Sequence, residues 1–338
     1  MKETDVTGSR NGVPTPSLSR RSALFAGASV LLALPLAACG SDDGKSDKGG
    51  QGDKAASSAA PSAAATPPHT ATHVYWANNG IHKNAALKAT AHTIGAAKLD
   101  GSGASQSLLS GIDYPNGLLA YGDYLYWTDT FANAIGRAKV DGSEMNKKFI
   151  TAGAAFPVGI ATDGTYLYWA NNGTFTISRA KLDGTGVQKK FITTGKDVKG
   201  TPNGLALKGG YVYWTTVSNT VARARTDGSE VNTDFVTDTG VQSDKVLSPI
   251  PVGLAVDDHY IYWANQADET IGRAKVDGTG ADKKFITGVS FPGGVAVDEQ
   301  YIYWSNNNDA IGRADLDGGN PNQKFITGAH APAGLAIW

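Results

Sequence analysis

The residues that could do chemistry are a few carboxylates and six scattered histidines. Asp163, Asp257 and Asp298 each end a short apolar stretch, and a calcium site would need several such oxygen atoms to converge. Each also directly precedes a turn of constant length, so capping of that turn is the favoured interpretation. The chain has no G-x-S-x-G and no HExxH, and the histidines are His69, His73, His82, His92, His259 and His330. We therefore predict no catalytic residue, no metal site and no cofactor.

Amide, hydroxyl and aromatic side chains form a second group, suited to binding. Polar stretches follow a repeated Tyr-Trp pair, as in "YWANNG" and "YWTDTF", and an aromatic residue, Ile or His precedes a repeated Pro-x-Gly. Amides beside aromatic rings suit recognition of a peptide or a sugar, and equally suit loop capping and packing. The candidate binding residues are His82, Tyr114, Asn116, Asp129, Phe156, Asn171, Asn203, Asn265, Phe291, Asn306 and His330.

These residues belong to a unit that recurs from His73 to the C-terminus. The tryptophans of successive Tyr-Trp pairs are 51, 42, 45, 49 and 41 residues apart, a period that suits four short strands. An Asp-Gly pair, which favours positive φ and a tight hairpin, follows the third expected strand of every unit. These pairs begin at Asp100, Asp141, Asp183, Asp227, Asp277 and Asp317.

Six four-stranded units predict a closed ring. A single open sheet of so many strands would leave long edges, whereas radial stacking gives an all-β, six-bladed β-propeller with antiparallel blades. The first unit begins at its second strand, "HVYW", and the C-terminal "APAGLAIW" has the pattern of a first strand. We expect the C-terminal strand to join the N-terminal blade and close the ring.

A repeated arginine in the third strand has two interpretations. The series could form an anion-binding ring, but a residue present in nearly every blade is better explained as a blade-to-blade structural contact. Its members are Arg137, Arg179, Arg223, Arg273 and Arg313, with Ala96 in the first unit.

Loop lengths distinguish the two faces of the expected ring. Ten residues separate the glycine of Pro-x-Gly from the tryptophan, and fourteen separate the start of strand three from the apolar residue of strand four. The other connections vary, with the insertions "GIHKNAALKATAHT" and "VTDTGVQSDKVLSPIP". We interpret their face as the binding face because loops on a rigid scaffold often carry recognition, although insertions are also simply tolerated there.

The N-terminal region predicts export and lipidation. Arg20 and Arg21 precede the apolar run "ALFAGASVLLALPLAA", and "LAAC" ends at Cys39, the only cysteine of the chain. This resembles the bacterial lipobox, in which the thiol is acylated. "SRRSALF" resembles the twin-arginine motif, but the twin-arginine and general secretory routes both remain open. We expect a signal peptide with lipobox over 1–38, a disordered tether over 39–72 and the propeller over 73–338.

Charge excludes one class of partner. The 338 residues carry a formal net charge of −1 and no basic stripe, so we expect no nucleic-acid partner. The lipid on Cys39 would instead make the membrane a partner, at the outer face of the cytoplasmic membrane.

The repeat resembles a known family. "YWTD", Tyr126 to Asp129, with "PNG" before it and "IGRAKVDG" after it, resembles the YWTD repeat of low-density lipoprotein receptor class B, a six-bladed β-propeller, and the resemblance covers residues 73–338. It implies that Asp129 is structural, bonding to backbone between blades. The other units depart at this position, with Asn78, Asn171, Thr216, Asn265 and Asn306; Asn can still accept a hydrogen bond.

The predicted function is a membrane-anchored, non-catalytic scaffold that binds a protein, peptide or glycan. Six-bladed propellers also include metal-dependent lactonases and lyases, so a hydrolase or lyase using the axial channel is the alternative. A sensory or assembly factor acting with a membrane enzyme would have the same sequence features.

Overall fold

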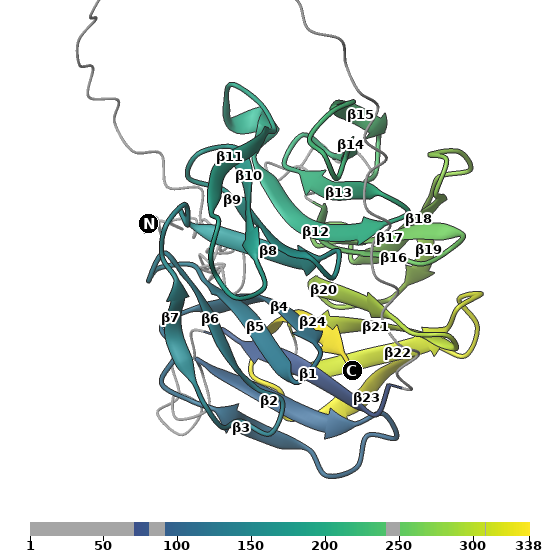
Figure 1. Cartoon of the computed structure of the whole chain (residues 1–338). Coiled ribbons are helices and arrows are strands. Elements are labelled where there is room, and N and C mark those ends of the chain that lie inside the picture. The colour runs from purple at the N-terminus through teal and green to yellow at the C-terminus, as the bar shows by residue number, and fades with distance from the viewer. Residues whose placement is uncertain (1–70, 81–91, 241–250, 308) are drawn as a thin grey trace, which may run out of the picture.

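The described part of the chain forms one ring of six sheets (Figure 1). The structure is a computed structural model, and it describes residues 71–80, 92–240, 251–307 and 309–338. Each sheet has four antiparallel strands, and the first strand of each blade packs beside the first strands of its two neighbours around the axis. The prediction of an all-β, six-bladed β-propeller is confirmed.

The blades follow the chain in order. Blade 1 holds β24 (Pro332–Ile337), β1 (His73–Asn78), β2 (Thr93–Lys98) and β3 (Ser105–Leu109). Blade 2 holds β4 (Pro115–Tyr121), β5 (Tyr124–Asp129), β6 (Ala134–Lys139) and β7 (Asn146–Ile150). Blade 3 holds β8 (Pro157–Thr162), β9 (Tyr166–Asn171), β10 (Thr176–Lys181) and β11 (Gln188–Thr193).

The second half of the ring repeats this arrangement. Blade 4 holds β12 (Pro202–Lys208), β13 (Tyr211–Thr216), β14 (Thr220–Arg225) and β15 (Asn232–Val236). Blade 5 holds β16 (Pro251–Val256), β17 (Tyr260–Asn265), β18 (Thr270–Lys275) and β19 (Asp282–Thr287). Blade 6 holds β20 (Pro292–Val297), β21 (Tyr301–Asn306), β22 (Ala310–Asp315) and β23 (Asn322–Thr327). The 3-10 helix η1 (Val198–Gly200) is three residues long. Among the described residues, no helix is long and apolar enough to span a bilayer.

The two ends of the propeller meet in blade 1. The C-terminal strand β24 pairs antiparallel with β1, with Val74 opposite Ile337 and Trp76 opposite Leu335. The backbone N–H groups of Thr72 and His73 also donate to the carbonyl of Trp338, at 2.9 and 2.6 Å. The predicted closure of the ring is confirmed.

The Tyr-Trp pair of each blade stabilises two blade interfaces at once, because neighbouring residues of a strand point to opposite faces. Tyr126 packs with Leu167 and Trp169 of blade 3, whereas Trp127 packs in the cluster of Tyr75 of blade 1. All six tryptophans are fully buried. The core is thus a series of clusters between adjacent blades, which explains why the pair is repeated.

The Asp-Gly hairpins have positive φ at the glycine, from 84° to 90° in the six pairs. The aspartate accepts from the backbone two residues on, as in Thr279 N to Asp277 Oδ1 at 2.8 Å. Each glycine N–H donates to the carbonyl three residues earlier, so the turn places a left-handed residue where glycine adopts that conformation without strain.

The repeated arginines each lie between two aromatic rings of their own blade. The Arg179 guanidinium carbon is 4.4 Å from the Tyr166 ring centroid and 3.7 Å from that of Phe191. Its Nη1 donates to the carbonyl of Thr226 in blade 4 at 2.8 Å. Two other members reach the next blade in the same way, Arg273 to the carbonyl of Leu316 and Arg313 to that of Leu99. The blade-to-blade interpretation is confirmed for these three arginines, whereas Arg137 and Arg223 are placed between rings of their own blades.

Candidate binding site at the mouth of the channel

A hollow lies on the axis, where the first strands of the blades begin. The middle residue of every Pro-x-Gly lines it, so blades 2 to 6 and then blade 1 contribute Asn116, Val158, Asn203, Val252, Gly293 and Ala333. Its empty volume is about 550 Å³, counting space open to solvent. Because blades 6 and 1 contribute only glycine and alanine at this level, the hollow has more room on their side.

The Pro-x-Gly glycines make this narrow ring possible. A Cβ atom on Gly117 would lie 2.1 Å from the carbonyl oxygen of Val158 in blade 3, and one on Gly334 would lie 2.2 Å from that of Asn116 in blade 2. The same close approach recurs at every seam between blades, at Gly159, Gly204, Gly253 and Gly294. Only glycine allows adjacent backbones to come so close.

At every second interface of the ring, a hydroxyl group links the two adjacent blades. Thr128 Oγ1 accepts from the N–H of Gly117 in its own blade at 2.8 Å and donates to the carbonyl of Val158 in the next blade at 2.7 Å. Thr215 and Ser305 make the same bridge from blade 4 to blade 5 and from blade 6 to blade 1. Blades 1, 3 and 5 have alanine there, at Ala77, Ala170 and Ala264. The third residue of the YWTD motif therefore helps to hold the ring in the three blades where it is threonine or serine.

The polar side chains that line the hollow are all uncharged at neutral pH. They are Asn79, Tyr114, Asn116, Asn203 and Gln266. Burial raises the pKa of Tyr114 above its ordinary value. Asn79 is 2% exposed, and its Oδ1 has no hydrogen-bond partner. The lining thus offers a buried acceptor and neutral amides, and no group of three or more His, Cys, Asp or Glu side chains able to hold a metal occurs in the part of the chain that is described.

An aromatic cluster borders the hollow at blade 2. The ring of Phe131 packs on Tyr114 with centroids 4.6 Å apart and planes tilted by 52°, and His92 meets the same tyrosine edge-on at 6.1 Å. Phe131 is 44% exposed although it is a large apolar side chain. Its ring therefore presents an apolar surface to solvent next to the polar hollow.

The structure brings only some of the predicted binding residues to this hollow. Tyr114, Asn116 and Asn203 line it. Phe156, Phe291 and His330 lie in the loops entering strand one, outside its lining; Phe291 is half exposed, and the N–H of His330 donates to Asn78 Oδ1. His82 lies outside the described residues, as do 81–91 and 241–250 of the two insertions.

Four of the predicted binding residues occupy the fourth position of the YWTD motif, and their side chains are buried and form hydrogen bonds with backbone groups. Asp129, Asn171, Asn265 and Asn306 are at most 2% exposed. Asp129 accepts from the backbone N–H groups of Asp113 and Tyr114, each at 3.0 Å, and so anchors the loop that connects blade 1 to blade 2. The hydrogen bonds of Asp129 show the structural role that the YWTD resemblance implies for it.

In blades 1 and 5 the residue after this position faces the channel. Asn79 and Gln266, which line the hollow, directly follow Asn78 and Asn265. Alternation along the strand supplies the reason, since a one-residue step moves a side chain to the opposite face. The same rule could have found Asn79 from the sequence.

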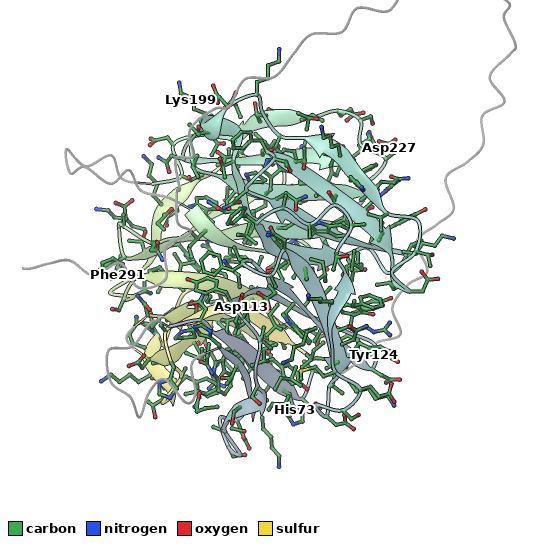
Figure 2. All side chains as sticks on the ribbon, turned by 90° about the vertical axis from the view of Figure 1, so that its left-hand side faces the viewer. His73, Asp113, Tyr124, Lys199, Asp227 and Phe291 are labelled. Carbon is green, nitrogen blue, oxygen red and sulfur yellow. The ribbon has the colours of Figure 1, made fainter. Side chains whose placement is uncertain are left out.

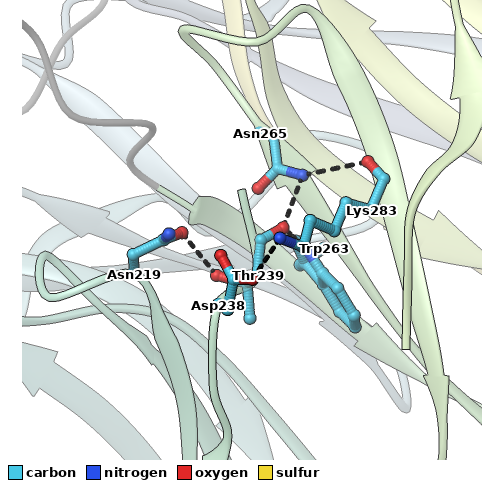
Figure 3. A network of polar contacts seen from close by, with 6 residues as sticks. All are labelled: Asn219, Asp238, Thr239, Trp263, Asn265 and Lys283. Carbon is cyan, nitrogen blue, oxygen red and sulfur yellow. Dashed lines mark hydrogen bonds and ion pairs between the residues drawn. The ribbon is translucent and has the colours of Figure 1, made fainter. Parts of the chain in front are cut away.

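Blade 5 shows how the loop between strands four and one is held (Figure 3). Asn265 Nδ2 and Trp263 Nε1 both donate to the carbonyl of Thr239 at 2.9 Å, and the Thr239 hydroxyl donates to Asn219 Oδ1 at 2.8 Å. Asp238 and Lys283 form an ion pair beside this network. Two side chains of blade 5 thus hold one carbonyl of the loop that leaves blade 4.

One acceptor in this network is left without a partner. Asn265 Oδ1 is buried and unpaired, whereas the same oxygen accepts from Ala155 N in Asn171 and from Ser290 N in Asn306. Pro249, outside the described residues, occupies the matching position in the sequence, and proline has no N–H to donate.

The three candidate metal-ligand aspartates lie elsewhere and cap turns. Asp257 Oδ1 accepts from the N–H groups of His259 and Tyr260 at 2.7 and 2.6 Å, and the Tyr262 hydroxyl donates to Oδ2 at 2.9 Å. Burial and then Asp257 raise the pKa of Tyr262. Asp163 and Asp298 make equivalent bonds. The turn-capping interpretation is confirmed.

The hollow and the start of the propeller lie on opposite faces. The hollow is on the face of the loops from strand two to three and from four to one, whereas β1 starts on the face of the tight turns, where Thr72 and His73 bond to Trp338. Figure 2 shows Lys199 and Phe291, from the variable loops, on one side and Asp227 and Tyr124, from the tight turns, on the other. Any segment preceding Thr72 therefore joins the propeller on the face away from the hollow.

Comparison with known proteins gives similarity in fold. No protein-family model matches the sequence, and no curated protein matches it. A chain of a nidogen/laminin complex is similar with a TM-score of 0.62 and 20% identity, over 79% of this chain and 98% of that one. Virginiamycin B lyase from Staphylococcus aureus has a TM-score of 0.51 and 19% identity, over 72% of this chain and 80% of that one. The chain is thus a six-bladed β-propeller with a YWTD-like fold.

Proposed function

We propose that this protein is an exported lipoprotein whose propeller is a non-catalytic binding module, with the channel mouth as its ligand site. Cys39 carries the lipid at the outer face of the cytoplasmic membrane, and the residues between it and Thr72 act as a tether. The ligand is a protein, peptide or glycan of the extracytoplasmic space.

The observation that carries this proposal is the position of the hollow relative to Thr72. The chain enters the propeller on the tight-turn face, and the hollow with its polar and aromatic lining opens on the other face. A module attached through one face keeps the opposite face clear of its own attachment. This arrangement suits capture of a ligand away from the lipid surface.

The chemistry of the hollow supports binding over catalysis by this channel. General acid–base catalysis needs a group that exchanges a proton near the working pH, most often His and otherwise Asp, Glu, Lys, Tyr or Cys. Of these types the lining of the hollow has Tyr114, and burial raises its pKa further from neutral pH. The likeness to a lyase lies in the fold, so the alternative of a hydrolase or lyase rests on no residue of this site.

A photo-crosslinker tests the binding face in intact cells. Replacing exposed Phe131 at the mouth by benzoylphenylalanine keeps an aromatic side chain, and replacing exposed Val231, near the tight turns, provides the control. We expect specific adducts from position 131 and none from position 231. Adducts from 231 alone, or none from either position, would contradict the proposal. Incorporation of labelled palmitate into the wild type but not into Cys39→Ser tests the anchor.

A further inference from the structure

We infer that the hollow at the channel mouth binds one residue of a neutral sugar. This inference rests on the proposed function and specifies the ligand class of the same site. It is carried by a buried acceptor, an uncharged lining, the dimensions of the hollow and an exposed ring at its border.

The buried acceptor is Asn79 Oδ1. The side chain is 2% exposed, lines the hollow and leaves this oxygen without a hydrogen-bond partner. A buried polar atom of this kind destabilises the protein until a donor reaches it. The oxygen itself is enclosed, so a rotation of the Asn79 amide toward the hollow would let an O–H or N–H group of a ligand reach it and remove that penalty.

The other polar groups set the charge of the ligand. Tyr114, Asn116, Asn203 and Gln266 can donate and accept hydrogen bonds but carry no charge. A carboxylate, phosphate or ammonium group brought into this hollow would lose water and find no opposite charge among its lining residues, which is costly. Neutral hydroxyl and amide groups are matched by the same side chains.

The shape of the site favours a sugar over a length of peptide. The hollow is shallow and open to solvent, and at the level of Pro-x-Gly only the last two residues of that motif line it in each blade, so it accommodates one ring or one side chain rather than several residues of main chain. Gly293 and Ala333, in blades 6 and 1, leave room on the side of the hollow where blade 1 adjoins blade 2 and Tyr114. Phe131, packed on Tyr114 and 44% exposed, offers a flat apolar surface to the C–H face of a sugar ring.

Calorimetric titration of the full, detergent-solubilised chain tests the inference. The probes are maltotriose, cellotriose and chitotriose, each up to roughly 10 mM, with the capped tripeptide acetyl-Gly-Asn-Gly-amide as the peptide probe. We expect at least one trisaccharide to bind, and Asn79→Leu to weaken it at least tenfold, or about 1.4 kcal/mol. Val231→Ala, on the other face, should retain binding. Phe131→Ala, at an exposed position, should weaken binding even if Asn79→Leu does not fold.

Three results would overturn the sugar assignment: no binding of any trisaccharide, binding of the tripeptide alone, or equal trisaccharide affinity in wild type, Asn79→Leu and Phe131→Ala. If position 131 gives adducts in cells and any of these three results is also found, the proposal that this face binds a ligand is retained and only the assignment of a sugar is refuted.

Discussion

Two glycines of blade 2 allow a direct test of how the ring is built. Gly117 and Gly136 would each place a new Cβ atom 2.1 Å from an existing atom. At Gly117 that atom is the backbone carbonyl oxygen of Val158 in blade 3, and at Gly136 it is a carbon of the Trp127 ring in the same blade. Neither glycine has positive φ, so Gly→Ala at the two sites differs mainly in what the methyl group meets.

The expected costs differ because backbone and side chain yield differently. At Gly117 the blades would have to separate by roughly 1 Å, and in a closed ring that movement strains every other seam, so we expect about 3 kcal/mol, the upper end for overpacking. At Gly136 the tryptophan can shift, as blade 4 demonstrates with Trp214 opposite Ala222. Trp127 Nε1 has no hydrogen bond to lose. We expect about 1 kcal/mol for Gly136→Ala, near the lower end for overpacking.

Thermal unfolding followed by circular dichroism measures the difference. For a domain of this size 1 kcal/mol corresponds to roughly 2 to 4 °C, so Gly117→Ala should melt roughly 4 to 8 °C below Gly136→Ala. A urea titration of both variants provides the free energies of unfolding. Equal melting temperatures, or a lower one for Gly136→Ala, would refute the argument that backbone contact between blades requires these glycines.

Further predictions concern the core, the closure, the arginine series and the turns. Trp127→Ala should lower the free energy of unfolding by about 3 to 5 kcal/mol, the range for deleting a buried aromatic side chain, and an unchanged urea midpoint would show that this side chain is not in the core. Deleting residues 332–338 removes β24 from blade 1 and should destabilise the propeller more than any substitution named here; unaltered thermal unfolding would mean that the ring is not closed by this strand. Arg179→Lys should cost about 1 to 2 kcal/mol, because lysine lacks the flat group that lies between two rings and bonds to Thr226; wild-type stability would make the arrangement incidental. Hydrogen bonds from the Thr279 hydroxyl and backbone lower the pKa of Asp277, so its stabilising effect is present above the unfolded pKa near 4 and is lost as pH falls, and the difference in melting temperature between wild type and Asp277→Asn should shrink between roughly pH 6 and pH 3.

The repeat made most of the fold predictable. Equal spacings in successive units predicted the strands, and the unmatched "HVYW" and "APAGLAIW" segments predicted the pairing of β1 with β24. The Tyr-Trp pair, the turn-capping aspartates and the arginine contacts also followed from their recurrence. A position that recurs in every blade serves what every blade needs, which is packing against its neighbours.

The candidate site was harder to predict because function breaks the symmetry of the repeat. The polar residues after Tyr-Trp include one that bonds to backbone and one that faces the channel, and the choice depends on where the strand ends. Asn265 is buried beneath its loop while Gln266, one residue later, lines the hollow. Composition cannot distinguish these neighbours, whereas the pleat of the strand can.

By itself the sequence determined the number of blades, the order of their strands, the closure of the ring and the face on which loops vary. These features depend on local periodicity and turn residues, which a single chain displays directly. Only the tertiary structure decided which side chains converge on the axis, because the hollow is made by one residue from each of several blades far apart in the chain. It also showed that Asn79 Oδ1 lacks a partner, since an unsatisfied atom is defined by all of its neighbours at once.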